Sequence, residues 1–128
     1  MDAAYEIAQY LHDAGFGTLE TDIFVDQIGA ETDGLYVESL GGELNYYLPI
    51  EEAVLNIYAK DTSASAAKTK LKNIKNHIHR MHNTVTTNAY IYSILAISNI
   101  ENVDRDLEYA KLYKLTLSVR CRDLQLIS

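Results

Sequence analysis

Three histidines first suggest chemistry, because imidazole is a common zinc ligand and His77, His79 and His82 lie close together in the sequence. The apolar spacing around them predicts a helix, in which His79 and His82 lie about 60° apart. His77 then lies roughly 160° from His79 and roughly 140° from His82. The three rings therefore cannot converge on one metal ion. The pair His79 and His82 would need an outside ligand, so we interpret these histidines as flanks of a basic helix.

Carboxylates of the first half are the second candidate for metal chemistry. Asp22, Asp26, Asp33 and Glu38 could supply oxygen ligands to a divalent cation. Their spacing does not match a calcium loop, which needs alternating oxygen ligands and a final glutamate. Weak Mg²⁺ or Ca²⁺ binding at a crowded interface stays open as an alternative, and we predict no dedicated metal site and no cofactor.

Signatures of nucleophilic catalysis and phosphate binding are missing from the sequence. Cys121 lies within an alternating apolar pattern that points its side chain inward, which predicts a small buried hydrophobe. The chain has no GxSxG motif, and Gly15-Phe16-Gly17 follows a predicted helix, whereas a phosphate-binding loop precedes one. We therefore predict that the protein is not an enzyme.

The predicted helix over 63–82 has a basic stripe, in which Lys68, Lys72 and Lys75 align with His79 and His82 beside the apolar face. Such a stripe could bind phosphates, which leaves a nucleic-acid-binding regulator as a remote alternative. The isoelectric point of about 4.9 is opposite to the usual electrostatic footprint of nucleic-acid-binding proteins. We favour the acidic surface of a neighbouring subunit as the partner of this stripe.

The acidic surface is suggested by an uneven distribution of charge. Residues 1–59 contain twelve acids and no Lys or Arg, whereas residues 60–128 contain eleven basic residues and six acids. Two unlike surfaces on one subunit suit head-to-tail contacts, which close into rings or grow into filaments. The alternative is that both halves form one sheet, in which the charges mix.

Periodicity predicts the elements that position these residues within one domain, residues 1–128. Ala4, Ile7, Ala8 and Leu11 recur at helical spacing after a capping Asp2. The second helix opens at 61–63 and runs to about His82. Strands are predicted over 22–28, 35–40, 52–59, 88–99 and 108–122. The fold class is α+β, a mostly antiparallel sheet of about five strands with two helices packed on one face, in the order α-β-β-β-α-β-β.

A tyrosine-bearing loop over 41–49 is the second predicted contact, because exposed tyrosines are favoured at interfaces. Its rings could instead fold back onto the protein's own sheet. The complete set of predicted interface residues is Lys68, Lys72, Lys75, Glu31, Asp33, Glu38, Glu43, Tyr46 and Tyr47.

Four segments resemble the phage minor capsid, or tail terminator, proteins of long-tailed, siphovirus-type phages and prophages. They are DAAYEIAQYLHDAGFGT, DIFVDQIGAETDGLYVESLGG, EEAVLNIYAKDTSASAAKTKL and NVDRDLEYAKLYKLTLSVRCRD. The resemblance covers nearly the whole chain and rests on overall pattern, since the family has no catalytic signature.

The resemblance implies a virion protein that forms a hexameric ring with itself at the head-proximal end of the tail tube. Its other implied partners are the tail tube protein and the head or neck connector, with DNA only passing through the lumen. It implies assembly in the host cytoplasm, without a membrane. An acidic lumen would let DNA slide. The rival within the virion is a neck protein of head–tail joining.

Overall fold

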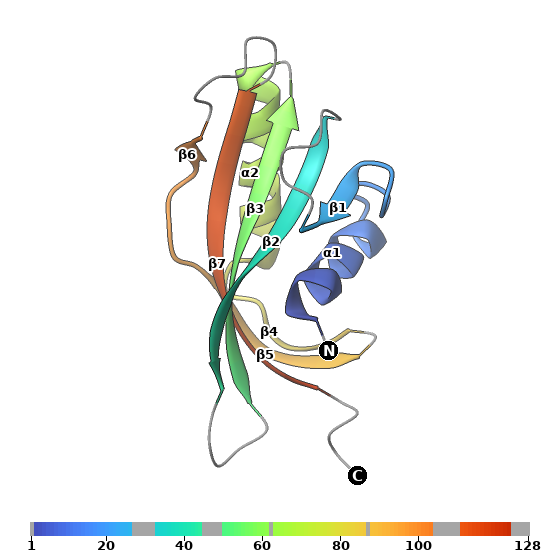
Figure 1. Ribbon diagram of the computed structural model, residues 1–128, viewed down its shortest axis with the longest axis vertical. Helices are drawn as coiled ribbons and strands as arrows, with labels where there is room; N and C mark the ends of the chain where they lie inside the picture. The colour runs from blue at the N-terminus through green and yellow to red at the C-terminus, as the bar shows by residue number, and fades with distance from the viewer. Residues whose placement is uncertain are drawn as a thin grey trace.

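The computed structural model describes residues 2–26, 33–44, 50–61, 63–86, 88–103 and 111–123, except for the side chains of residues 43, 44 and 111. The predicted tyrosine loop lies mostly outside these ranges. Two helices and seven strands follow one another in the order shown in Figure 1. They are α1 (Ala3–Asp13), β1 (Ile23–Val25), β2 (Gly34–Leu44), β3 (Glu51–Asp61), α2 (Ala64–Ile78), β4 (His82–Val85), β5 (Ala89–Ala96), β6 (Glu101–Asn102) and β7 (Lys111–Asp123).

The strands form one mixed sheet in the order β1-β2-β3-β7-β5-β4, while β6 also pairs with β7. Strand β1 runs parallel to β2, and the other pairs are antiparallel. The α+β class and the mostly antiparallel arrangement are therefore confirmed, whereas the prediction of about five strands was wrong. The two extra strands, β4 and β6, are short and polar, so no apolar alternation marks them in the sequence.

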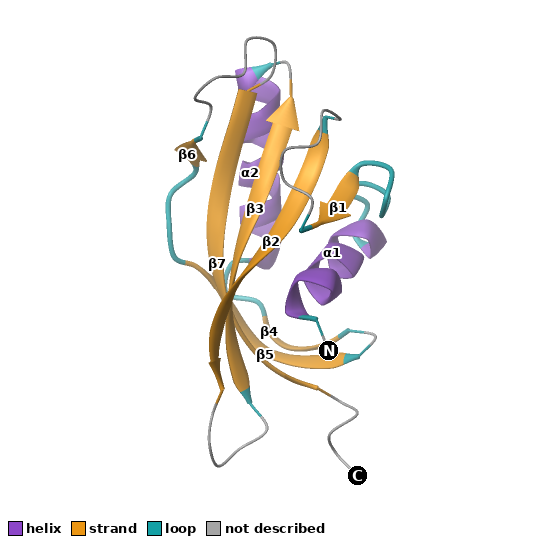
Figure 2. Cartoon of the chain, viewed as in Figure 1, coloured by secondary structure: helices purple, strands orange, loops and turns teal. Residues whose placement is uncertain are grey.

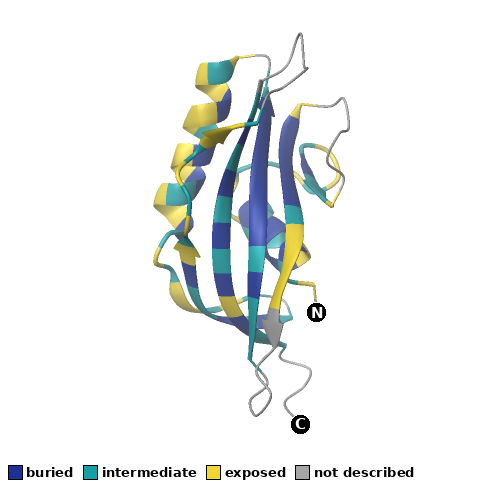
Figure 3. Ribbon diagram, turned by 60° about the vertical axis from the view of Figure 1, so that its left-hand side comes forward, coloured by how far each residue is buried: buried dark blue, intermediate teal, exposed yellow. Residues whose placement is uncertain are grey.

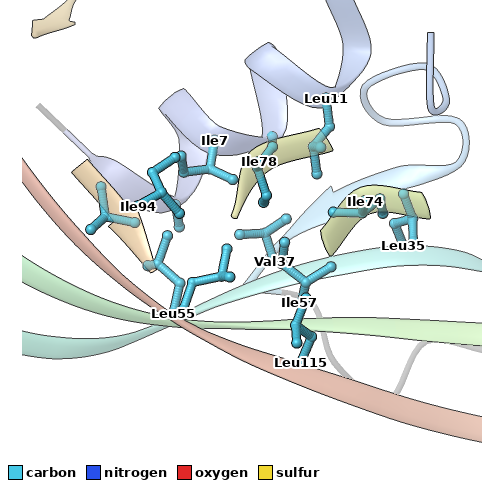
Figure 4. Packing of buried hydrophobic residues seen from close by; sticks show 14 of the residues in the cluster. Ile7, Leu11, Leu35, Val37, Leu55, Ile57, Ile74, Ile78, Ile94 and Leu115 are labelled. Atoms are coloured by element: carbon cyan, nitrogen blue, oxygen red, sulfur yellow. The ribbon is translucent and has the colours of Figure 1, made fainter. Parts of the chain in front are cut away.

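Both helices cover the same face of the sheet, as predicted (Figure 2). The Asp2 carboxylate caps α1 by accepting hydrogen bonds from the backbone N–H groups of Ala4 and Tyr5, and the Ser63 hydroxyl caps α2. Ile7 and Leu11 of α1 and Ile74 and Ile78 of α2 point into the same core (Figure 4). The strands contribute Leu35, Val37, Leu55, Ile57, Leu115 and Leu117.

The second helix is shorter than its periodicity predicts. It ends at Ile78, because His79 has extended backbone angles and Arg80 has a φ of +66°. The chain then reverses, and the Arg80 N–H donates to the Ile94 carbonyl at 2.8 Å. Residues 82–85 can therefore pair with β5, and His82 lies in a strand.

The prediction that the second strand ends at residue 40, before a loop over 41–49, is also wrong. Strand β2 continues through both glycines to Leu44, and a register shift between Ser39 and Gly42 takes up one extra residue. A bulge of this kind preserves pairing with β3 on both sides. The long β2–β3 ladder overrides the local tendency of two glycines to form a turn.

The other face of the sheet carries no helix among the described residues (Figure 3). Along β7 the buried residues Tyr113, Leu115, Leu117, Val119 and Cys121 face the helices. The residues between them, from Lys114 to Arg122, face the other side and are half-buried or exposed. We call this second side the helix-free face. Among the described residues, neither helix is long and apolar enough to cross a membrane.

Candidate subunit interface

The basic stripe of α2 consists of Lys68, Lys72 and Lys75, which lie on the side of the helix away from α1. His77, on the opposite side, packs its ring against Tyr10 and Phe16, with centroids 5.7 and 5.4 Å apart. Lys68 and Lys72 are exposed and Lys75 is half-buried. The Lys68 ammonium lies 5.3 Å from the centre of the Tyr113 ring, which places the stripe beside β7.

An acidic flank lies at the opposite side of the subunit, around the edge strand β1. It consists of four exposed carboxylates: Asp13 ends α1, Glu20 lies in the following loop, Asp26 follows β1, and Asp33 precedes β2. The Asp26 carboxylate accepts a hydrogen bond from the Ser39 N–H at 2.9 Å. No ion pair within the described chain involves these four acids. The flank therefore offers negative charge to a partner.

A groove of about 450 Å³ runs beside the acidic flank. The residues that line it come largely from β1 and its neighbouring loop, and they combine apolar side chains with polar groups that include the Glu20 carboxylate. The lining residues are Tyr5, Leu19, Glu20, Ile23, Phe24 and Val25. Such a groove suits a lysine, whose apolar stem can pack while its ammonium meets a carboxylate.

Of the acids predicted to meet the stripe, Asp33 lies on the acidic flank, whereas Glu38 lies on the helix-free face. The Glu38 carboxylate accepts hydrogen bonds from the Tyr58 hydroxyl at 3.2 Å and the Asn56 amide at 3.4 Å. Burial, and then the nearby Glu38 charge, raises the pKa of Tyr58, so its hydroxyl stays protonated and can donate. Glu38 is thus engaged within its own subunit.

The other predicted contact residues lie wholly or partly outside the part of the chain that the structure describes. Glu31, Tyr46 and Tyr47 lie outside the described residues. Glu43 is placed only by its backbone, opposite Glu52 on β3. Their contribution to an interface stays a prediction.

The three histidines lie in separate environments. His77 contacts the two rings of the α1 side, and Nδ1 of His79 accepts a hydrogen bond from the Ala96 N–H at 2.9 Å. His82 begins β4 and is exposed. Among the described residues, no three His, Cys, Asp or Glu side chains are grouped so that they could hold a metal ion.

The lone cysteine is buried, as predicted. Burial, followed by the charges of Glu51 and Glu6, raises the pKa of Cys121 to about 12. The thiolate is the reactive form, so the native thiol is inert at neutral pH. We expect the folded protein to react with a maleimide or an aromatic disulfide at least about a hundredfold more slowly than the urea-unfolded chain. Equal labelling rates in the two states would contradict the placement of Cys121 in the core.

The two halves of the sequence are joined by an ion pair in the middle of the sheet, whereas the acidic flank and the basic stripe lie apart at its sides. Arg120 donates to Glu52 through Nε at 3.1 Å and through Nη2 at 2.5 Å, which joins β7 to β3. The other described ion pair, in which Lys114 lies 3.8 Å from Glu101, joins two residues of the second half. Both sequence interpretations therefore apply, each to a different part of the molecule.

Comparison with known proteins agrees with the predicted resemblance. The family described as "Bacteriophage tail terminator protein" matches residues 10–123. No curated protein matches the chain. Among solved structures, a chain of "Virion of native gene transfer agent (GTA) particle" superposes with a TM-score of 0.54 at 15% identity, covering 94% of this chain and 93% of that chain. That likeness shows a shared fold. Because the family match spans most of the sequence, the chain belongs to the bacteriophage tail terminator proteins and is a structural protein of the phage virion.

Proposed function

We propose that this protein forms a ring, of six copies by the family resemblance, that caps the head-proximal end of a tail tube. The ring stops polymerisation of the tube and provides the surface to which the head attaches. Its role is structural, without catalysis. The observation that carries this proposal is the placement of unlike charges on opposite sides of one subunit, the acidic flank beside β1 and the basic stripe on α2.

The ring is closed by a head-to-tail contact, in which the basic stripe of one subunit meets the acidic flank of the next. A heterologous contact of this kind uses two different surfaces and closes when the rotation between neighbours allows it. Exposed ion pairs contribute only about 0–1 kcal/mol each, so charge alone holds such a ring weakly. The groove beside Glu20 supplies the additional contact area, and the stems of Lys72 and Lys75 are its proposed occupants.

Electron microscopy of lysates from the parent phage with this gene deleted tests the proposal. We expect headless tails of irregular and excessive length, because only loss of a stop signal lets the tube continue to grow. Complementation with the wild-type gene in trans should restore one uniform length. Tails of normal length beside separate, filled heads would instead assign the protein to head–tail joining, as a neck component.

A further inference from the structure

A second basic site lies at the end of the helix-free face, centred on Arg122. The guanidinium carbon of Arg122 lies 5.1 Å from the centre of the Tyr90 ring and 5.8 Å from that of Tyr92. The two rings lie 5.0 Å apart and are tilted by 57°. The Tyr90 hydroxyl donates to the Asn83 side chain at 3.2 Å, which fixes this ring to β4. We call Arg122, Tyr90 and Tyr92 the arginine cradle.

A bulge in β5 builds the cradle. Tyr90 pairs directly with Arg122, and the register then shifts between Ile91 and Ser93, so Tyr92 is the extra residue. The shift lets both Ile91 and Ile94 face the core while Tyr92 leans toward Arg122. Bulges often redirect a side chain in this way.

The charge of Arg122 is uncompensated within the described chain. No described carboxylate forms an ion pair with it, and its Nε atom is buried without a hydrogen-bond partner among those residues. The neighbouring Arg120 differs, because it binds Glu52. A guanidinium held against aromatic rings keeps its outer N–H groups oriented to bind a carboxylate with two hydrogen bonds.

Apolar side chains lie further along the same face, beyond the row of Ser93, Arg120 and Glu52 that separates them from the cradle. Leu95 and Val54 both pair with Ser118, on either side of β7, so all three lie in one row of the helix-free face. Leu95 is 46% exposed and the following Ile97 is 56% exposed. Tyrosine and arginine beside apolar residues are the composition typical of interface hot spots.

We propose that the arginine cradle, Leu95 and Ile97 dock a carboxylate-bearing, apolar segment of a second virion protein. The inference rests on the proposed function, because the neighbouring subunit would already use its acidic flank on the basic stripe. That stripe belongs to the helix layer, whereas the cradle belongs to the opposite face of the sheet. Ring closure therefore leaves the cradle open to a different protein, and its unpaired positive charge selects an acidic one.

A photo-crosslinker placed at position 95 tests the proposal in assembled particles. The variant Leu95→p-benzoylphenylalanine is incorporated into tails and irradiated, and the crosslinked peptides are sequenced by mass spectrometry. We expect crosslinks to a protein other than this chain, within a segment that contains Asp or Glu. The same crosslinker at Asn73, an exposed residue on α2, is the positional control and should not yield that peptide.

Adding Arg122→Glu to the crosslinker variant should lower the yield of that peptide on the order of tenfold or more. Sedimentation of the purified variant should still show rings. Because Arg122→Glu could disturb folding, Ile97→Glu at an exposed site provides a second variant with the same expected loss, and thermal unfolding checks both.

Crosslinks to copies of this chain alone, or an unchanged yield in both variants, would overturn the proposal. Retention on double-stranded DNA that Arg122→Glu removes would assign the cradle to nucleic acid and would also overturn it. The ring and the docking site are tested by different results. Wild-type subunits that never form rings would refute the ring, whereas the crosslinked peptide at position 95 would still identify a docking partner.

Discussion

Reversing both Lys72 and Lys75 to glutamate abolishes ring formation if the basic stripe meets the acidic flank of the next subunit. The double variant places like charges opposite each other at every contact around the ring. Unlike pairs are worth about 0–1 kcal/mol each when exposed, whereas like charges brought together at an interface cost several kcal/mol. Sedimentation velocity and negative-stain microscopy of the assembled ring measure the loss.

Two further variants distinguish the contact from a general effect of charge. Thr69→Glu with Asn73→Glu adds negative charge to exposed positions of α2 that lie off the stripe, and these changes should leave rings intact. Asp13→Lys with Asp33→Lys, introduced into the Lys72→Glu and Lys75→Glu background, should restore rings by exchanging the charges. Unchanged rings in the original double variant would refute the pairing.

The same contact predicts a dependence on ionic strength. Exposed charges are screened over about 8 Å at physiological ionic strength, and over shorter distances as salt rises. Rings of the wild-type protein should therefore dissociate more readily at high salt. The restored, charge-exchanged variant should show the same salt dependence, since the sign of each partner does not affect screening.

Periodicity predicted the helical core well and the polar elements poorly. The helical spacing of α2 predicts an inner stripe of Ala64, Ala67, Leu71, Ile74, Ile78 and Met81, because a helix has one core-facing stripe. The middle four are the fully buried residues of α2, whereas Ala64 is half-buried and Met81 lies beyond the end of the helix. Strand β4 has no such pattern. Its residues are half-buried or exposed, and only pairing with β5 makes them a strand. This hairpin is held by backbone pairing, which leaves no apolar alternation in the sequence of β4.

Burial of Glu6 also has no signal in the sequence. Its neighbours Ile7 and Ala8 were predicted to face inward, whereas a glutamate in the first turn of a helix is usually solvated. In the structure Glu6 is 2% exposed, and its Oε1 accepts a hydrogen bond from the Asn88 N–H at 2.6 Å. A backbone donor far away in the sequence thus holds the carboxylate inside.

The candidate interface was predictable in its charges and only partly in its residues. The absence of Lys and Arg before residue 60 predicted an acidic surface, and the helical spacing predicted the basic stripe. Of the predicted acids, Asp33 lies on the acidic flank. Which acids share that surface depends on the parallel pairing of β1 with β2, which places Asp33 and Asp26 at opposite ends of this strand pair. The arginine cradle depends on a bulge, and a bulge is set by the register between β5 and β7.

Gly34→Ala should be the most damaging single substitution at the acidic flank. Gly34 has a φ of +155°, and a Cβ atom there would lie 2.5 Å from the backbone carbonyl oxygen of Asp22. That oxygen accepts the hydrogen bond from the Leu35 N–H at 2.7 Å, where β1 meets β2. Because the added Cβ atom would meet a backbone oxygen, no change of side-chain rotamer can relieve the clash. We expect a loss of about 3 kcal/mol or more of unfolding free energy.

Gly15→Ala separates the clash from backbone strain. Gly15 also has a positive φ, +90°, but no atom lies within 4 Å of the position that an added methyl group would take. Its substitution should cost about 1 kcal/mol, the usual penalty for a side chain in that conformation. The midpoint temperature of thermal unfolding should therefore fall by roughly 10 °C or more for Gly34→Ala and by only a few degrees for Gly15→Ala. Equal shifts would show that the close approach of β1 and β2 is unimportant.

The consequence of Gly34→Ala for assembly follows from where the damage lies. Loss of the β1–β2 pairing displaces the groove wall and the flank carboxylates, while α2 packs chiefly on β3 and β7 at the centre of the sheet. Hydrogen exchange should therefore accelerate first at the Leu35 amide, and rings should be lost at temperatures where the rest of the sheet stays protected. Rings that persist after the Leu35 amide has become unprotected would show that β1 does not form the contact, and the acidic flank would then lie outside the ring interface.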